Sequence, residues 1–118
     1  MITKSTVIEL TEKLFVYNEK ALSRLLHVHQ TEAEADFYME VKPYVDAFFI
    51  ELDEWEMVTK KWIQDEKPKY IHLNQITSTI ENLHNVVLQS FYKDTREKRF
   101  KQMYQANKYV LESILANE

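Results

Sequence analysis

Histidine and carboxylate side chains lie near one another at two places in this 118-residue chain, and a metal ion is the first chemistry to consider. Glu81 and His84 have the Glu-x-x-His spacing that ferritin-like helical bundles use to bind metals. Those bundles need a second such pair and two further glutamates, whereas this chain has a single pair. His84 also lies beside the apolar stripe of its segment. We therefore interpret the pair as part of an ordinary polar helix face.

A second group of possible metal ligands comprises His27, His29, Glu32 and Asp36. Imidazole and carboxylate groups bind several divalent metals. Residues two apart on a helix point in different directions, however, so His27 and His29 cannot chelate one ion from a regular helix. A role at the negative end of a helix dipole is favoured instead. We expect no metal and no cofactor in this protein.

The charges of the chain are unevenly distributed around a net charge of −4. Residues 32–56 contain nine acids against Lys42 alone, whereas residues 93–101 contain five bases against Asp94 and Glu97. The basic run lacks the alternating aromatic residues of a single-strand binding platform, and nucleic-acid modules are usually basic overall. We therefore expect no nucleic-acid partner. Within this run, Arg96, Arg99 and Lys101 are the candidate binding residues, for another protein.

No catalytic arrangement can be assigned from residue types and spacing. The chain has no glycine, which excludes P-loops and dinucleotide-binding fingerprints because their backbone turns require it. It has no cysteine, so thiolate catalysis and cysteine zinc sites are excluded too. None of its serines lies in a glycine-flanked elbow. We predict no catalytic residues, and the question of enzymatic activity stays open.

The elements that would carry these residues are helical. From residue 31 to 66, apolar residues recur in steps of three and four, which is one face of an α-helix. Trp55 and Trp62 belong to this stripe and are predicted to lie in the core rather than in a ligand pocket. The other stripe members are Phe37, Val41, Val45, Phe48 and Leu52.

Capping signals place the ends of this long helix. Thr31 and Glu34 have capping-box spacing at its start, and Lys67 followed by Pro68 ends it. Pro43 lacks the N–H that an unbroken helix would need. The apolar phase continues through the proline, which predicts a kinked helix, with a break into two helices as the alternative.

Three further helices are predicted. The first runs over residues 3–29, and its main stripe includes Tyr17. The third begins at an N-cap formed by His72 with Gln75. The fourth is capped by Asp94 and Glu97, and Asn107 interrupts its stripe of Phe100, Met103, Val110 and Ile114.

Short connections between four helices predict an all-α, antiparallel up-and-down four-helix bundle that occupies residues 1–118 as a single domain. This arrangement brings the basic start of the fourth helix beside His27, His29 and the acidic start of the second. We expect opposite charges to meet there as a screened surface network.

The expected location is the cytoplasm. The chain lacks a signal-peptide hydrophobic region at its amino terminus, and its apolar runs are too short to span a membrane. The absence of cysteine is compatible with a reducing compartment.

Several short segments resemble the YppE-like family of small Firmicute proteins. They are Pro68-Lys69-Tyr70-Ile71-His72 with Gln75-Ile76, Val87-Leu88-Gln89-Ser90-Phe91-Tyr92, Lys98-Arg99-Phe100-Lys101 and Lys42-Pro43. The resemblance covers about the last two thirds of the chain. It implies a four-helix domain of unknown function, so it assigns no catalytic or binding residue.

The favoured function is a non-enzymatic, cytoplasmic interaction module that presents charged helix faces to a protein partner. The alternative is a helical bundle that binds a metal or small ligand in an unrecognised pocket, which could be an enzyme. Asn107, Glu81, His84 and Tyr17 are the polar residues that suggest such a pocket. A flanking stripe of Ile8, Phe15 and Leu22 leaves both a monomer and a homodimer open.

Overall fold

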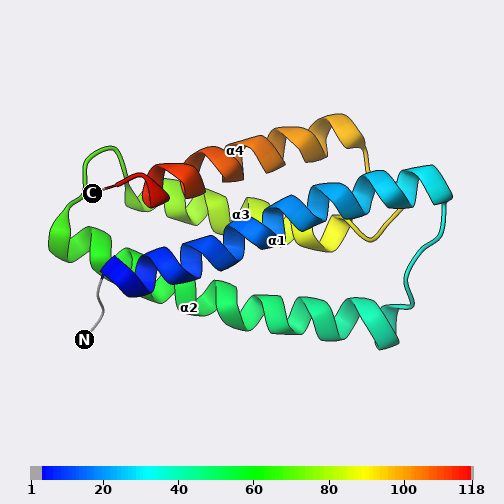
Figure 1. The fold of residues 1–118 in the computed structure, drawn as a ribbon, viewed down its shortest axis with the longest axis horizontal. Helices are drawn as coiled ribbons and strands as arrows, with labels where there is room; N and C mark the ends of the chain where they lie inside the picture. Colours follow the sequence, from blue (N-terminus) through cyan, green and yellow to red (C-terminus); the bar gives the residue numbers. More distant parts are fainter. Residues whose placement is uncertain (1–3, 118) are drawn as a thin grey trace.

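Each of the four periodic segments forms an α-helix in the computed structural model, which describes residues 4–117. The helices are α1 (Lys4–Thr31), α2 (Lys42–Glu66), α3 (Leu73–Gln89) and α4 (Glu97–Leu115). A short π-helical turn, η1 (Phe37–Val41), precedes α2. Successive helices run in opposite directions, and the start of α1 and the end of α4 lie at the same end of the bundle (Figure 1). The predicted all-α, up-and-down four-helix fold is confirmed.

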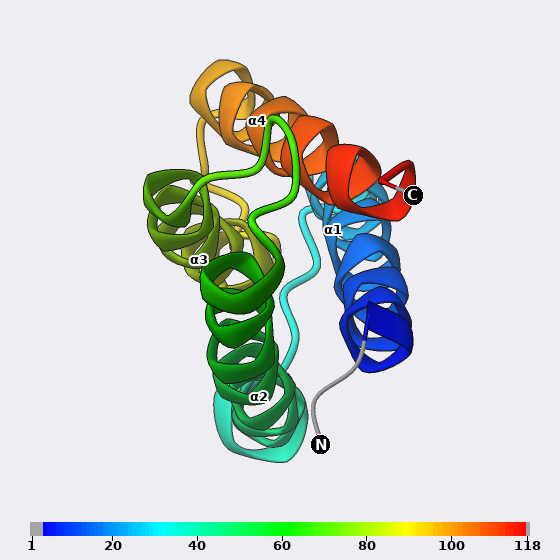
Figure 2. The same ribbon diagram turned by 90° about the vertical axis from the view of Figure 1, so that its left-hand side faces the viewer.

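The helices occupy the four corners of the bundle when it is viewed from its end (Figure 2). Helices α2 and α4 stand at opposite corners, while α1 and α3 contact each other across the other diagonal. One core cluster draws residues from all four helices. A smaller cluster joins α1, α3 and α4 around Phe100 and Tyr104. No helix within residues 4–117 is both long and apolar enough to cross a membrane.

Both tryptophans lie in the core, as predicted. Trp55 is fully buried and Trp62 is 5% exposed. The indole Nε1–H of Trp55 donates a hydrogen bond to Thr11 Oγ1 at 2.9 Å. The same Thr11 hydroxyl donates to the Val7 carbonyl at 2.6 Å, so the Thr11 hydroxyl and the Trp55 indole N–H both have hydrogen-bond partners.

The buried stripe of α1 differs from the prediction in three residues: Thr11 and Asn18 belong to it, and Tyr17 does not. Asn18 is fully buried, whereas Tyr17, which was predicted to belong to the main stripe, is half-buried and faces α2. The predicted first residue of this helix, Thr3, lies outside the described residues. Ile8, Phe15 and Leu22 are half-buried and pack against the two core clusters.

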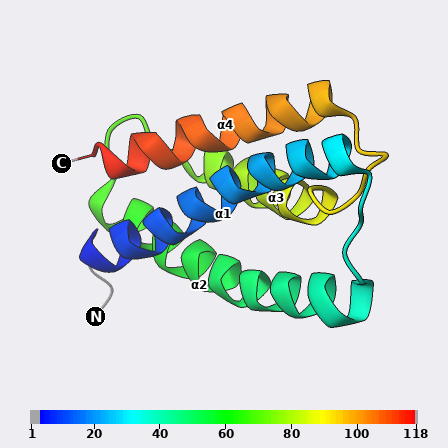
Figure 3. The same ribbon diagram turned by 45° about the vertical axis from the view of Figure 1, so that its right-hand side comes forward.

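The predicted start of the second helix is wrong. Thr31 belongs to the last turn of α1, where its hydroxyl donates to the His27 carbonyl at 2.9 Å. The chain then leaves the helix at Glu32, whose φ is 58°. Asp36 is the N-cap of the next helical segment, η1, because its Oδ1 accepts the Met39 N–H at 2.8 Å. Figure 3 shows the resulting connection, which runs from the end of α1 down to α2.

Pro43 marks the beginning of α2 rather than a kink inside a longer helix. It occupies the first turn of the helix, where a backbone N–H has no intrahelical acceptor and proline is well tolerated. The preceding π-turn supplies its own bond, from the Lys42 N–H to the Phe37 carbonyl. Helix α2 has 25 residues. The π-turn joins it without a gap, because Val41 and Lys42 both have right-handed helical backbone angles, so the helix changes type just before Pro43 and does not break there.

The connection between α2 and α3 agrees with the prediction. Lys67 ends α2 with a φ of 47°, a left-handed conformation that glycine adopts more easily. Gln75 Oε1 accepts the backbone N–H of the N-cap His72 at 2.8 Å. Ile71 and Ile76 on either side are buried, as expected for a hydrophobic staple.

The fourth helix begins later than its predicted caps indicated. Arg96 is the N-cap of α4 and Glu97 is its first residue, whereas Asp94 lies outside the helix. The buried face of α4 also includes Asn107, together with Tyr104 and Leu111. Met103 and Val110, which were predicted to lie on the main stripe, are half-buried. The stripe was therefore predicted about one position away from its true centre.

Candidate functional site

The predicted binding residues Arg96, Arg99 and Lys101 all lie at the exposed start of α4, and we call them the α4 basic surface. Lys101 is tied to its own helix, because its Nζ lies 3.0 Å from Glu97 Oε1. Arg96 and Arg99 form no ion pair with any other residue in the range 4–117. The charges of these two guanidinium groups are therefore available at the surface.

Opposite charges meet at this end of the bundle, as the sequence indicated, but through other groups. Glu97 Oε2 lies 2.9 Å from His29 Nδ1 at the end of α1. The hydrogen bond from His29, followed by that from Lys101, lowers the pKa of Glu97. The acidic connection after α1 contributes Glu34, whose Oε2 accepts the backbone N–H of Lys93 at 2.7 Å.

The histidine and carboxylate pairs have ordinary structural surroundings. The ring of His84 stacks on Phe49 with centroids 4.4 Å apart, and Glu81 is exposed. Asn107 lies in the core, where its Nδ2 donates to Asn18 Oδ1 at 3.1 Å. In the part of the chain that the structure describes, no three histidine or acidic side chains come together as a metal site.

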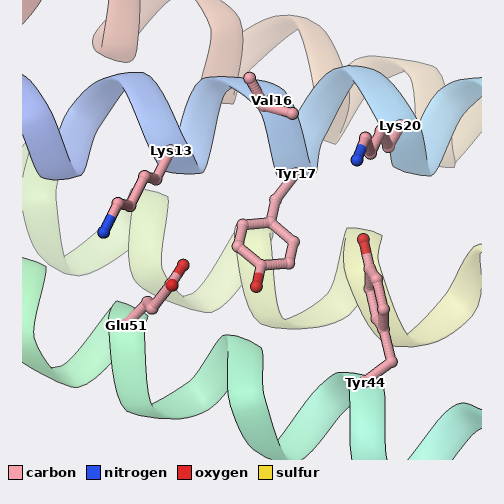
Figure 4. Close-up of a pocket in the computed structure, with 6 residues that line it drawn as sticks. All are labelled: Lys13, Val16, Tyr17, Lys20, Tyr44 and Glu51. Atoms are coloured by element: carbon pink, nitrogen blue, oxygen red, sulfur yellow. The ribbon is translucent and has the colours of Figure 1, made fainter.

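A hollow between α1 and α2, which we call the α1–α2 pocket, has a volume of about 360 Å³ (Figure 4). Helix α1 lines it with Lys13, Val16, Tyr17 and Lys20, and helix α2 lines it with Tyr44 and Glu51. Ligand sites in proteins generally have volumes of about 300–1,000 Å³, so the hollow is large enough for a small molecule. Its lining combines aromatic rings with charged groups.

Aromatic packing fixes the rings of this pocket. Tyr17 and Tyr44 meet edge to face with centroids 5.6 Å apart. Tyr17 also packs against the buried Phe48 at 4.9 Å, and Tyr44 against Phe91 at 5.6 Å. Such pairs restrict both rings beyond what burial alone would do. The two tyrosines therefore form a firm wall.

The guanidinium group of Arg24, one turn beyond Lys20 on α1, packs against this tyrosine wall. The Arg24 Cζ atom lies 4.5 Å from the ring centroid of Tyr44 and 4.3 Å from that of Phe91. Its Nη1 donates to Ser90 Oγ at 2.8 Å. No carboxylate within residues 4–117 pairs with Arg24, so its positive charge stays uncompensated beside the pocket.

The two tyrosine hydroxyls of the pocket have different surroundings. The Tyr17 hydroxyl faces Glu51 across the pocket, and burial followed by the Glu51 charge raises the pKa of Tyr17. The Tyr44 hydroxyl oxygen is shielded from water and has no hydrogen-bond partner among residues 4–117. Buried hydroxyls normally have a partner. The Tyr44 hydroxyl can therefore still form a hydrogen bond.

Sequence reasoning found one of the six pocket residues, Tyr17, and missed the pocket itself. A signal was present, because Lys13 and Lys20 are seven residues apart, as are Tyr44 and Glu51. Residues seven apart lie on the same helix face. The sequence does not show that these two faces oppose each other, because that depends on how α1 and α2 pack.

The fold and its motifs define a family of bacterial four-helix domains. A family model described as a bacterial domain of unknown function (DUF1798) matches residues 11–117. The chain belongs to this family. It is 28% identical over 109 residues to the uncharacterized protein YppE of Bacillus subtilis, covering 92% of this chain and 89% of that protein.

Solved structures confirm the resemblance drawn from the motifs. The crystal structure of YppE from Bacillus subtilis has a TM-score of 0.91 at 27% identity, covering 96% of this chain and 92% of that one. A protein of unknown function from Listeria innocua has a TM-score of 0.90 at 27% identity, covering 95% and 90% of the two chains. These relatives share the fold with this chain, and the family carries no assigned function.

Proposed function

We propose that this protein is a cytoplasmic, non-enzymatic interaction module whose α4 basic surface binds an acidic surface on another protein. One observation carries the proposal: Arg96 and Arg99 are exposed without an ion-pair partner among residues 4–117. A charge network with the acidic start of the second helix would have used these guanidinium groups. The contacts that form at this end use Glu97 and Glu34 instead.

The chemistry of arginine suits such a contact. A guanidinium group can bind a carboxylate through two parallel hydrogen bonds, and arginine is enriched at protein interfaces. Arg99 lies in the first turn of α4 and Arg96 caps it, so the helix fixes the spacing of the two. A partner with two or more neighbouring carboxylates would match this spacing.

The test is charge reversal at this surface. Arg96→Glu, Arg99→Glu and Lys101→Glu are combined in one variant, and partners recovered from a native lysate are compared with those of the wild type by mass spectrometry. A control variant reverses Lys61, Lys67 and Lys69, which lie at and beyond the end of α2. Circular dichroism checks that both variants fold.

We expect at least one protein to bind the wild type and the control variant but not the α4 variant. Its binding should weaken as salt rises, because exposed charges are screened over about 8–10 Å at physiological ionic strength. Partners that bind all three forms equally would refute the assignment of this surface. Recovery of nucleic acid in place of an acidic protein would refute it as well.

A further inference from the structure

We propose that the α1–α2 pocket binds a small ligand that joins an aromatic ring to an anionic group, either a carboxylate or a phosphate. This inference is independent of the proposed protein contact. It uses residues of α1 and α2, whereas the α4 basic surface lies on a different helix.

The charges around the pocket select an anion. Lys13 and Lys20 oppose a single acidic residue, Glu51, so the lining carries one net positive charge. Arg24 adds a second positive charge behind the Tyr44 ring. This excess of positive charge would repel a cationic ligand and attract an anionic one.

The position of Glu51 fixes the end of the pocket at which the anion would lie. Figure 4 shows Glu51 beside Lys13 at one end, with Lys20 and Tyr44 at the other. Glu51 already interacts with the Tyr17 hydroxyl and would repel an anion from its own end. The anionic group is therefore expected between the Lys20 ammonium and the Tyr44 hydroxyl.

The Tyr44 hydroxyl gives the strongest indication that something binds here. Its oxygen has no partner in the part of the chain that the structure describes, yet its ring is held in place by Tyr17, Phe91 and Arg24. The Lys20 ammonium and the Tyr44 hydroxyl point toward each other from opposite helices (Figure 4). The hydroxyl oxygen is shielded from water, so an anion reaches it only when a neighbouring side chain moves, and the exposed Lys20 is free to move. Both groups can then donate hydrogen bonds to one anion.

The ring of the ligand would lie against the tyrosine wall. Tyr17, Tyr44 and the exposed side chain of Val16 offer apolar surface along the middle of the pocket. Aromatic rings gain from edge-to-face or offset contacts with such a wall. The volume of about 360 Å³ accommodates one or two fused rings with a small anionic substituent.

The experiment is an NMR titration of the ¹⁵N-labelled chain with 1-naphthoate and with 1-naphthyl phosphate. The cation 1-naphthylmethylamine, which presents the same rings, is the control. We expect saturable amide shifts in the pocket-lining segments of α1 and α2 with at least one anion, and none with the amine. The anion that binds more tightly identifies the natural ligand as a carboxylate or a phosphate. Binding of neither anion, or equal binding of the amine, would overturn the proposal.

Two variants test the anion contacts without removing a bond within the protein. Tyr44→Phe deletes a hydroxyl that has no protein partner, so the fold should be unaffected. It should still weaken anion binding by about ten- to 150-fold, the usual effect of losing a hydrogen bond to a charged group. Lys20→Gln should weaken binding to a similar extent.

A matched control is Lys61→Gln, which makes the same change on the exposed face of α2 away from the pocket. It should bind the anion as the wild type does. The Arg96→Glu, Arg99→Glu, Lys101→Glu variant should also bind it normally, which separates this result from the protein contact. Wild-type affinity in both Tyr44→Phe and Lys20→Gln would overturn the assigned anion position.

Discussion

Helix α1 meets α4 on one side and α2 on the other, and neighbouring residues of α1 face these two contacts. Asn18 faces α4, is fully buried and bonds to Asn107 and to the Tyr104 carbonyl. Tyr17 faces α2 and lines a pocket. The contact with α4 is closed around the hydrogen-bonded amides of Asn18 and Asn107, although Asn107 Oδ1 has no partner within residues 4–117. The contact with α2 is open at the pocket.

The difference follows from the side chains that each contact must accommodate. Toward α4, short amides pair across the interface and let the helices approach. Toward α2, two tyrosine rings and two lysines line the contact. Such long side chains pack by their stems and keep their charges in water, which leaves a hollow between the helices. The closed contact should therefore determine stability, and the open contact is the one available for binding.

The largest effect is expected for Asn18→Ala at the closed contact. This change creates a cavity and leaves the buried amide of Asn107 without a partner, because Asn107 Oδ1 already lacks one. We expect a loss of about 2–4 kcal/mol in the free energy of unfolding, from the cavity and the unpaired amide together. Urea unfolding followed by tryptophan fluorescence measures it.

The double variant Asn18→Ala, Asn107→Ala serves as the control for this explanation. Once Asn18 is gone, removing Asn107 deletes an amide that no longer has a partner. The loss in the double variant should thus be smaller than the sum of the two single losses, as for residues that interact directly. Strict additivity would mean that the asparagine pair contributes nothing of its own.

A matched pair of tyrosine variants compares the two contacts directly. The Tyr104 hydroxyl donates to Glu19 Oε1 at 2.6 Å, whereas the Tyr44 hydroxyl has no partner. Tyr104→Phe should lower the free energy of unfolding by about 1.5–3 kcal/mol, the usual value of a hydrogen bond to a charged group. Tyr44→Phe should leave it unchanged or raise it slightly. Equal losses would contradict the difference that we draw between the two contacts.

The buried parts of the fold were predicted well from the sequence, because buried residues recur at the period of the helix. The steps of three and four along α2 identified the core positions of Trp55 and Trp62, and His72 with Gln75 identified the start of α3. The start of α2 was predicted wrongly. Thr31 and Glu34 have capping spacing, but Asp36 followed by Pro43 forms the cap that the chain uses. Both pairs of residues are local signals for a helix start, and their spacing alone did not show which of them the chain uses.

The candidate sites were less predictable, since they depend on which groups remain without partners. Arg96, Arg99 and Lys101 were recognisable as a basic run, but the sequence did not show that Lys101 pairs with Glu97 while both arginines stay free. The pocket was missed because its lysines and tyrosines read as ordinary helix surface. Asn107 was noticed as an interruption of a stripe, and its partner Asn18 was visible only once α1 and α4 were packed.

Alkaline titration should report on Tyr104 at the closed contact. Burial, followed by the hydrogen bond to Glu19, raises the pKa of Tyr104 from 10.0 to about 12. Between these values the folded chain keeps a proton that the unfolded chain loses, so this group's contribution to stability falls as pH rises. The difference in unfolding free energy between wild type and Tyr104→Phe should therefore shrink from pH 10 to pH 12. A difference that stays constant over this range would contradict the raised pKa.

The smallest effect is expected for Glu97→Gln, which lies at the exposed end of the bundle, away from both contacts. The hydrogen bonds from His29 and Lys101 lower the pKa of Glu97 in the folded chain. Its contribution is thus present above the ordinary carboxyl pKa of 4.5 and is lost as pH falls through the lowered value. Acid unfolding of the variant should show a slightly weaker pH dependence in that range, and a steeper one would contradict the sign. Because this pair is exposed, added salt should also reduce the difference between variant and wild type, whereas salt should leave the Asn18→Ala loss nearly unchanged.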